Sequence, residues 1–417
     1  ETRRRRGVAP DVISYATVAR CYGRCSFVSL DSLKGLYRRM MDSGVVLDNA
    51  VFNVILNVVA KKIAAPRRCE DCVAFMSEVF DDMKSNEIKM DKYTLNSSLE
   101  IYHKCGKDGD EMLKLLQEMD VSASLISFNI ILKNLCKQDR MEEAHTFLQN
   151  MVTKYIKDNQ SIKPTVDTFN TLINAYSQQG NYIKCEEVLA SMQDFHSYDN
   201  APATNPDRIS YSNLIHSLRH GSNEFDTATR AIQLLDQVEA EYDQKGYESL
   251  KPDSTLYNIV INAIAKSHHP NKAHEALKIV DRITTRDDFR VTTTALNGVL
   301  NACAYSNKTD ANELNILALA LDVYKRFKTY RIRPDQITFM MLLKTCVNLS
   351  DYSQKKKYIL TLFRECCVQG LVDERIMKEV WGGLKKDDAQ KALGPYYKQG
   401  KKKLPMEWTR RCRKRKS

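Results

Sequence analysis

The sequence has few of the residues that interrupt helices. It contains 10 prolines and 15 glycines among 417 residues, and their scarcity favours long helices over a fold with many tight turns. It also has no run of 18 or more apolar residues, which excludes the usual sequence pattern of a membrane-spanning helix. Hydrophobic residues still make up 43% of the chain, which is enough for a continuous core.

Signatures of catalysis are missing as well. We find no glycine-rich phosphate loop, no Gly-x-Ser-x-Gly elbow and no His-Glu-x-x-His pair. Cys69 and Cys72 have the spacing of metal ligands, but a structural zinc site normally needs two such pairs. We therefore predict that the chain is not an enzyme and needs neither a metal nor a cofactor.

Charge and cysteine are placed unevenly. Residues 398–417 hold ten Lys/Arg and one Glu, and residues 1–7 hold four Arg and one Glu, so the rest of the chain is nearly neutral despite a net charge of +11.

Most of the 12 cysteines stand singly in apolar helical patterns, where a free thiol behaves as a small buried hydrophobe. This predicts a reducing compartment. Examples are Cys105, Cys136, Cys185, Cys303 and Cys346.

One motif recurs nine times: a bulky apolar residue, then usually a small polar residue, then an apolar stretch. Each copy contains two amphipathic segments with the three- and four-residue spacing of a helix. The copies start 33 to 46 residues apart, which is the length of a helix-turn-helix with additional loop residues. The pattern predicts an all-α solenoid of about nine helix-turn-helix repeats. The residues that follow the bulky one are Ala16, Asn53, Asn96, Asn129, Asn170, Ser212, Asn258, Asn297 and Met340.

Proline marks the repeat boundaries. Five of the ten prolines, such as Pro164 and Pro252, directly precede an Asp or Thr that can cap the next helix. We expect a basic segment over 1–10, a repeat array over 11–373, a capping helix over 374–395 and a basic tail over 396–417. The repeats lie near 12–48, 49–91, 92–124, 125–165, 166–207, 208–253, 254–292, 293–335 and 336–373, and are called repeats 1 to 9 below.

Asparagine follows the bulky residue in six of the nine copies. Because Asn is about 0.6 kcal/mol worse than Ala inside a helix, its recurrence needs a cause. One cause is structural, since an amide can link adjacent repeats or bond its own backbone. The other is functional, because an amide offers donors and an acceptor to the edge of an unpaired base. The sequence leaves both explanations open.

The repeats resemble those of the pentatricopeptide-repeat family. The resemblance is carried by Phe169 to Tyr176 with Met192 and Pro206-Asp207, by Phe128 to Cys136, and by Tyr257 to Ala265. It extends over roughly residues 11–373 and is closest to arrays without an added catalytic domain. The closing segment from Leu404 to Trp408 is similar to the ends of algal and stramenopile organellar members. The resemblance implies a right-handed solenoid.

The resemblance further implies that each repeat reads one RNA base with two residues, the polar residue after the bulky one and the last residue of the repeat. A residue near the start of the first helix is expected to wedge between bases, and the candidates are Ile13, Ala50, Tyr93, Ile126, Asp167, Ile209, Thr255, Thr294 and Ile337. Repeats 1 and 9, with Ala16 and Met340, depart from the pattern. The implied target of repeats 2 to 8 is U-C-Y-U-G-Y-U, where Y is a pyrimidine. The selecting pairs are Asn53 with Asp91, Asn96 with Ser124, Asn129 with Thr165, Asn170 with Asp207, Ser212 with Asp253, Asn258 with Thr292, and Asn297 with Asp335.

Two functions fit the sequence. The first is sequence-selective binding of single-stranded RNA in a mitochondrion or chloroplast, acting on RNA stability, processing or translation, and for it the basic tail contacts phosphates through Lys401, Lys402, Lys403, Arg410 and Arg411. The second is a scaffold role in an organellar ribosome or another ribonucleoprotein complex, in which the array grips protein or structured RNA. The sequence starts at Glu1 rather than Met, so we expect a targeting segment to precede it.

Overall fold

The computed structural model describes residues 10–26, 28–119, 121–158, 162–199, 204–218, 226–286, 289–306, 313–396 and 404–412. Within these ranges the chain forms 21 α-helices and no β-strand. The prediction of an all-α fold is therefore confirmed. No helix in these ranges is both long and apolar enough to cross a membrane.

The chain divides into two compact units, Glu1–Ala175 with Val188–Asn205 and Tyr176–Glu187 with Pro206–Ser417. The boundary passes through α9 (Val166–Gln179) and α10 (Tyr182–Asp199). The first unit also holds α1 (Val12–Arg24), α2 (Leu30–Met41), α3 (Asn49–Val58), the π-helical turn η2 (Val59–Ile63), α4 (Cys69–Ser85), α5 (Lys92–Cys105), α6 (Gly109–Glu118), α7 (Leu125–Lys137) and α8 (Met141–Lys157). The second also holds α11 (Arg208–Ser217), α12 (Thr227–Lys245), α13 (Ser254–Lys266), α14 (Lys272–Thr284), α15 (Thr293–Ala304), α16 (Glu313–Thr329), α17 (Gln336–Val347), α18 (Tyr352–Gln369), α19 (Glu374–Gly383), α20 (Lys386–Leu393) and α21 (Met406–Thr409).

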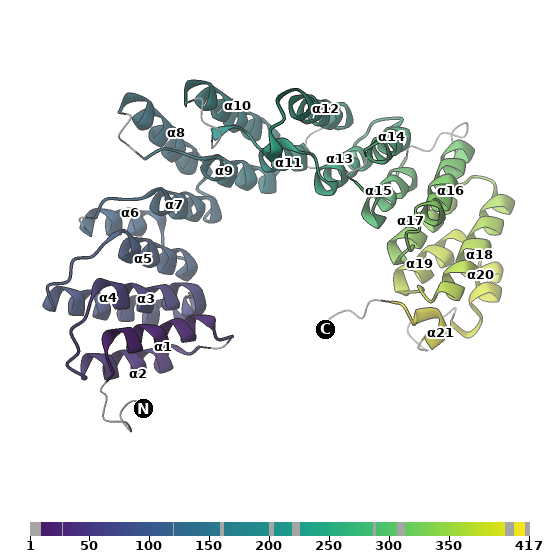
Figure 1. The fold of residues 1–417 in the computed structure, drawn as a ribbon. Coiled ribbons are helices and arrows are strands. Elements are labelled where there is room, and N and C mark those ends of the chain that lie inside the picture. Colours follow the sequence, from purple (N-terminus) through teal and green to yellow (C-terminus); the bar gives the residue numbers. More distant parts are fainter. Residues whose placement is uncertain are drawn as a thin grey trace. The chain divides into compact units, whose positions relative to one another are not determined.

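Within each unit, the first helices of successive hairpins pack directly against one another (Figure 1). In the first unit α3 packs against both α1 and α5, and α5 packs against α7. In the second unit the same holds for the series α11, α13, α15, α17 and α19. We call these first helices the A helices and the second helices the B helices. Outside the hairpin of α9 and α10, each B helix packs on the A helix of its own hairpin and, in most repeats, on the next A helix.

The residue that ends a repeat is the N-cap of the next A helix. Asp48 accepts a hydrogen bond from the backbone N–H of Val51 at 2.9 Å, and Asp253 accepts one from Leu256 at 2.8 Å. Such a cap contributes about 1 kcal/mol, so the repeat period of the sequence is also the period of the helix starts. Asp11, Asp91, Ser124, Asp207, Thr292, Asp335 and Asp373 cap A helices in the same way.

The bulky residue of the motif belongs to the core between A and B helices. Phe52, Phe169 and Tyr257 are fully buried, and so is Phe339. All 12 cysteines are free thiols. Burial raises the pKa of the Cys185, Cys303 and Cys346 thiols to about 12, which fits their expected role as apolar core residues. Cys105 is buried too, and Cys136 is partly buried with its pKa raised by burial to about 12.

The end of the array has more structure than a single capping helix and a tail. Residues 374–396 hold α19, α20 and a short 3-10 turn. Residues 404–412 fold back onto α18 and the turn after it: the Val372 N–H donates to the Trp408 carbonyl at 2.8 Å, and the Arg411 N–H donates to the Gly370 carbonyl at 2.9 Å. The Trp408 ring packs edge-on against Phe363, with centroids 5.6 Å apart. This part of the expected basic tail is therefore docked on α18 and the turn that follows it.

Candidate nucleic-acid interface

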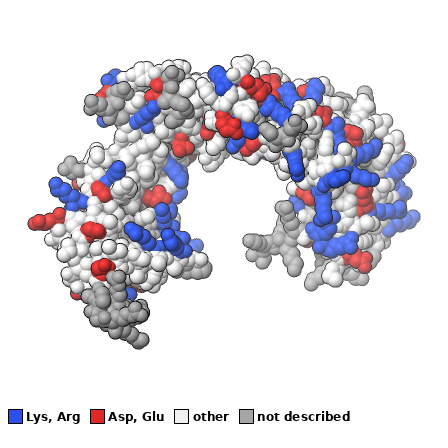
Figure 2. All heavy atoms as spheres, viewed as in Figure 1, with Lys and Arg blue, Asp and Glu red and all other residues white. Residues whose placement is uncertain are grey.

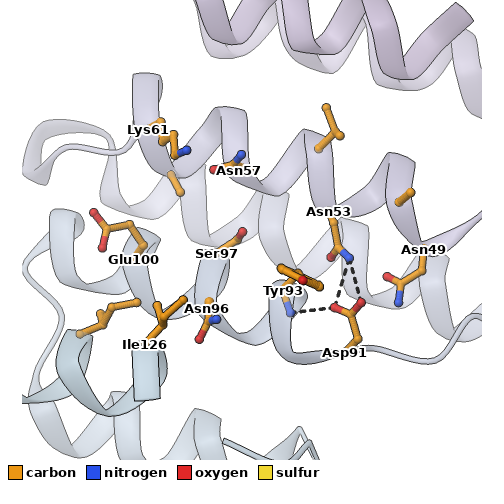
Figure 3. A pocket seen from close by; sticks show the side chains of 14 residues that line it. Asn49, Asn53, Asn57, Lys61, Asp91, Tyr93, Asn96, Ser97, Glu100 and Ile126 are labelled. Atoms are coloured by element: carbon orange, nitrogen blue, oxygen red, sulfur yellow. Dashed lines mark hydrogen bonds between the residues drawn. The ribbon is translucent and has the colours of Figure 1, made fainter. Parts of the chain in front are cut away.

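The amide of repeat 2 is joined to the cap of the next A helix. The Asn53 Nδ2 donates to both carboxylate oxygens of Asp91, at 3.1 and 3.2 Å (Figure 3). The Thr94 hydroxyl donates to the Asn53 Oδ1 at 2.7 Å. A carboxylate can only accept hydrogen bonds, so the amide nitrogen must face Asp91. The predicted selecting pair of this repeat is thus in direct contact.

Repeat 8, in the second unit, has the same arrangement. The Asn297 Nδ2 donates to the Asp335 Oδ1 at 3.0 Å, and the Thr338 hydroxyl donates to the Asn297 Oδ1 at 2.7 Å. Two repeats that are far apart in the sequence therefore hold the amide in one geometry. Asn297 is 8% exposed.

Two further pairs are joined through hydroxyls. In repeat 3, Asn96 Oδ1 accepts from Ser124 at 3.1 Å and from Ser127 at 2.6 Å. In repeat 7, Asn258 Oδ1 accepts a longer bond, 3.4 Å, from Thr292.

Other contacts are observed at the remaining pairs. In repeat 4 the buried Oδ1 of Asn129 has no hydrogen-bond partner among the described residues. In repeat 6, Asp253 caps α13 and forms an ion pair with Arg208 at 3.3 Å, while Ser212 is partly buried on α11. In repeat 5, Asn170 is 8% exposed on α9, and Asp207 caps α11 by accepting from the Ser210 N–H at 2.9 Å.

These contacts bear on why asparagine recurs. In repeats 2, 3, 7 and 8 its amide links one A helix to the cap of the next, so the structural explanation of the pattern is observed directly. This does not remove the functional explanation, because an amide nitrogen carries two N–H groups. The two oxygens of one carboxylate lie close together, so a single N–H of Asn53 serves both and the second stays available.

The candidate wedge positions are all exposed. Each is the second residue of an A helix, and the bulky apolar ones have large exposed fractions, although most bulky apolar side chains of a folded chain are buried. These fractions are 68% for Ile13, 60% for Tyr93, 58% for Ile126, 53% for Ile209 and 40% for Ile337. The smaller or polar candidates Ala50, Asp167, Thr255 and Thr294 are exposed as well.

An open cavity of about 780 Å³ brings the residues of repeats 2 and 3 together. It lies over α3, η2, α5 and α7, and Figure 3 shows the side chains that line it. The amides of Asn53 and Asn96, the carboxylate of Asp91 and the exposed side chains of Tyr93 and Ile126 all face this space. The selecting amides of two repeats and three candidate wedges, Ala50, Tyr93 and Ile126, thus line one cavity.

Known proteins share these repeats. The family model of the pentacotripeptide-repeat region of PRORP matches residues 29–158, and the model of a single pentatricopeptide repeat matches residues 167–196. The crystal structure of the pentatricopeptide repeat protein PPR10 from maize shares the fold over 94% of this chain and 54% of its own, with a TM-score of 0.56 and 18% identity. The matched residues, 29–158 and 167–196, consist of pentatricopeptide repeats.

The curated relatives are plant proteins. A pentatricopeptide repeat-containing protein of Arabidopsis thaliana is 26% identical over 198 residues, which are 45% of this chain and 31% of the relative. The small ribosomal subunit protein mL103 (rPPR7) of the same species is 22% identical over 295 residues, 66% of this chain and 63% of its own length. The chain therefore spans less than two thirds of the relatives that it matches.

Cationic residues of the A helices were missed at the sequence level. Arg24, Lys61, Lys104 and Lys137 each stand eight residues after the selecting position of repeats 1 to 4, a spacing that places them two turns further along the same helix face. Figure 2 shows Lys and Arg side chains gathered on the A-helix side of the first unit. The eight-residue spacing is a signal that the sequence contained.

Three cations of this face line a second cavity. It measures about 360 Å³, lies over α1, α3 and η2, and is lined by Arg20, Arg24, Lys61 and Asn57 among others. Among the described residues no ion pair involves these three cations. By contrast, the Lys104 Nζ donates to the Ala60 carbonyl at 2.7 Å and thus ties two A helices together.

The predicted phosphate contacts of the tail fall into two groups. Lys401, Lys402 and Lys403 lie outside the described residues. Arg410 and Arg411 are exposed in the docked segment, and the Arg410 Nη2 donates to the Val368 carbonyl at 2.7 Å. The described residues contain no cluster of His, Cys, Asp or Glu suited to a metal ion.

Proposed function

We propose that the chain binds single-stranded RNA and selects its sequence, with repeats 2 to 8 each contacting one base. The observation that carries the proposal is the recurring amide with its capping partner beside an exposed wedge, as in Asn53, Asp91 and Tyr93. The free N–H of such an amide and the carboxylate of the cap suit the Watson–Crick edge of an unpaired base.

The wedges supply the contacts that do not depend on sequence. Stacking of a base on an aromatic side chain contributes about 1–3 kcal/mol and tolerates any base. Tyr93 and Ile126 offer such surfaces on both sides of Asn96 in the larger cavity. A base inserted there is covered by apolar side chains while its edge faces the amide.

Phosphate groups are the proposed ligands of the unpaired cations. Arg20, Arg24 and Lys61 converge on one cavity next to the selecting residues of repeat 2. Cations that replace the counterions of a nucleic acid make its binding depend on salt. The same role is proposed for Lys401, Lys402, Lys403, Arg410 and Arg411 in the C-terminal segment.

The proposed target is the pyrimidine-rich series U-C-Y-U-G-Y-U, with repeats 1 and 9 reading no base. By holding a single strand, the protein would keep nucleases and competing RNA structure away from it and so act on RNA stability, processing or translation. A mitochondrial or chloroplast location is part of the proposal. One relative is named a mitochondrial pentatricopeptide repeat-containing protein, which supports it.

The test is a competition binding assay with the intact chain. A labelled U-C-U-U-G-U-U oligonucleotide is displaced by itself or by poly(A) of equal length, and we expect the matched competitor to act at about tenfold or lower concentration, since a mismatched base costs about 1–3 kcal/mol in comparable readout. Equal competition by poly(A) would contradict sequence selection.

A second function, a subunit of an organellar ribosome, is favoured by one observation, the similarity to mL103 over 66% of this chain. Sedimentation separates the two proposals. Stable migration with a ribosomal subunit, together with indifferent oligonucleotide binding, supports the second, whereas selective binding by the free protein supports the first.

A further inference from the structure

A buried hydroxyl holds the selecting amide in three repeats. Thr94, Ser127 and Thr338 are the third residues of α5, α7 and α17. Each is fully buried, and each donates to the amide oxygen of the preceding repeat, at 2.7, 2.6 and 2.7 Å. We propose that this hydroxyl is a positioning residue that fixes the orientation of the amide and thereby sharpens base selection in repeats 2, 3 and 8. The inference rests on the proposed RNA-binding function.

The hydrogen bonds of Thr94 leave the amide one orientation. The hydroxyl accepts from the Asp91 N–H at 3.2 Å, and the Asn53 Oδ1, at 2.7 Å, is a nearer acceptor for its proton than the Asp91 Oδ1 at 3.1 Å. A flipped amide would turn its oxygen toward the Asp91 carboxylate, which has no proton to give. The amide nitrogen therefore stays on the Asp91 side, and its second N–H remains the group offered to a base in the adjoining cavity.

This role differs from helix capping. The A helices α13 and α15 have Leu256 and Ala295 at the same position and are nevertheless capped, by Asp253 at 2.8 Å and by Thr292 at 3.1 Å. A cap thus does not need the hydroxyl. Without a hydroxyl at this position, α15 cannot donate from its third residue to Asn258 of the preceding repeat. Among the described residues, Asn258 accordingly has the 3.4 Å contact with Thr292 alone.

Repeat 4 completes the comparison. Thr168 has the hydroxyl at the equivalent position, but its nearest hydroxyl partner is Thr165 at 3.4 Å, and the Asn129 Oδ1 has no partner. Among these five repeats, the hydroxyl at the third helical position holds the preceding amide in repeats 2, 3 and 8, whereas repeats 4 and 7 show no such bond among the described residues.

The experiment compares Thr94→Val, which removes the hydroxyl at nearly constant volume, with the matched control Thr94→Ser, which keeps it. Binding is measured for four oligonucleotides that differ only at the nucleotide facing repeat 2, and for four that differ only at the nucleotide facing repeat 8. We expect Thr94→Val to reduce discrimination at the first nucleotide by about two- to tenfold, the effect of one hydrogen bond. Thr94→Ser should retain it, and neither variant should change the second nucleotide. Thr338→Val should show the reverse pattern.

Ala295→Ser provides a gain-of-function arm that does not depend on the stability of the valine variants. It should increase discrimination at the nucleotide facing repeat 7 by supplying the missing donor to Asn258. If the wild type discriminates among bases but Thr94→Val discriminates equally well at repeat 2, the positioning role is wrong while the proposed function stands. A wild type that binds all eight oligonucleotides equally overturns the proposed function and this inference with it.

Discussion

At the scale of single residues, hydrogen bonds offset the low helix propensity of asparagine. Each of Asn53 and Asn297 exchanges about 0.6 kcal/mol of helix propensity for hydrogen bonds to the next A helix. A hydrogen bond of this kind contributes about 0.5–1.5 kcal/mol net, so the bonds of each amide to its two partners together exceed the propensity loss. The same residues are therefore useful to the stack before any ligand is considered.

The family resemblance implied the pairs Asn53 with Asp91 and Asn297 with Asp335, and the structure joins the two residues of each pair. Their role in base selection stays a prediction. The role of Thr94 was not predictable. A hydroxyl at the third helical position is expected for a capping box, and only the three-dimensional distance to Asn53 reveals a second task.

Tyr93 gives the first prediction at this scale. Its side chain is 60% exposed and lines the larger cavity, so Tyr93→Ala should weaken RNA binding by about 1–3 kcal/mol, the value of one stacking contact, without lowering the melting temperature. The matched control is Val46→Ala, because Val46 is 89% exposed and does not line the cavity. Fluorescence anisotropy and thermal melting measure the two effects, and an equal loss of affinity in both variants would speak against a wedge.

His103 gives a prediction for pH. It is buried on α5 and hydrogen-bonded to the Asn134 side chain at 3.0 Å, and burial holds its pKa below the usual 6.5. The unfolded chain therefore takes up a proton near pH 6.5 that the folded chain resists, so this contribution to stability is present above pH 6.5 and is lost as the pH falls toward the lowered pKa. Denaturant titrations at pH 7.5 and pH 5.5 should show the loss, and His103→Gln should flatten it. An unchanged pH dependence in the variant would contradict the assignment.

At the scale of the elements, the A helices and B helices differ in their contacts. Besides the amide links, the A helices meet through close apolar contact, as between α13 and α15, where a Cβ on Gly298 would lie 2.5 Å from the Ile261 Cγ2. Successive B helices are bridged by polar side chains. Examples are Tyr37 to Asp82 at 2.6 Å and Arg282 to Asp236 at 2.5 Å.

Gly298 tests the close approach of the A helices. Gly298→Ala should destabilise the second unit by about 1–3 kcal/mol, because an added methyl group overpacks the contact with Ile261. The matched control is Gly382→Ala, in α19, where nothing lies within 4 Å of the added Cβ and helix propensity favours Ala by about 1 kcal/mol. Thermal melts of the two variants should shift in opposite directions. A shift of the same sign in both would show that packing at Gly298 is not tight.

The helices themselves were largely predictable from the sequence. Apolar spacing and the Asp or Thr boundaries located the hairpins, because burial and capping are set locally. The docking of residues 404–412 was not predictable, since the many Lys and Arg residues of 398–417 give this segment the composition of an exposed tail, although Trp408 packs between Phe363 and Tyr396. The contact between residues 404–412 and α18 occurs once, so no repeating pattern in the sequence indicates it.

At the scale of the whole molecule, charge is the property that the sequence totals described least well. The net charge of +11 is concentrated near the two ends of the sequence. This distribution predicted phosphate contacts in the C-terminal tail and none in the array. The folded chain instead brings Arg20, Arg24 and Lys61 from two helices to one cavity. Nor did the sequence indicate the division into two units, whose boundary passes through the hairpin of repeat 5.

These cations give a prediction for salt. If each replaces about one counterion of a single strand, with a slope near 0.7 per phosphate, the triple variant Arg20→Gln, Arg24→Gln, Lys61→Gln should reduce the slope of log K against log salt by roughly 2. Lys114→Gln serves as the control, since Lys114 lies on the B helix α6 and pairs with Glu118 at 3.6 Å. Titrations between low and high salt measure both slopes, and an unchanged slope in the triple variant would exclude these cations from phosphate binding.

The most direct measurement of base reading is a change of specificity at one repeat. Asn297→Ser gives repeat 8 the Ser–Asp combination that stands in repeat 6 as Ser212 with Asp253, for which we infer guanine. Affinities of wild type and variant are compared for two oligonucleotides that carry uridine or guanosine opposite repeat 8 and are otherwise identical. The account predicts that the wild type binds the uridine strand more tightly and that the variant prefers the guanosine strand. If both proteins bind the two strands with the same ratio of affinities, the amides on the A helices hold the stack together and do not read RNA.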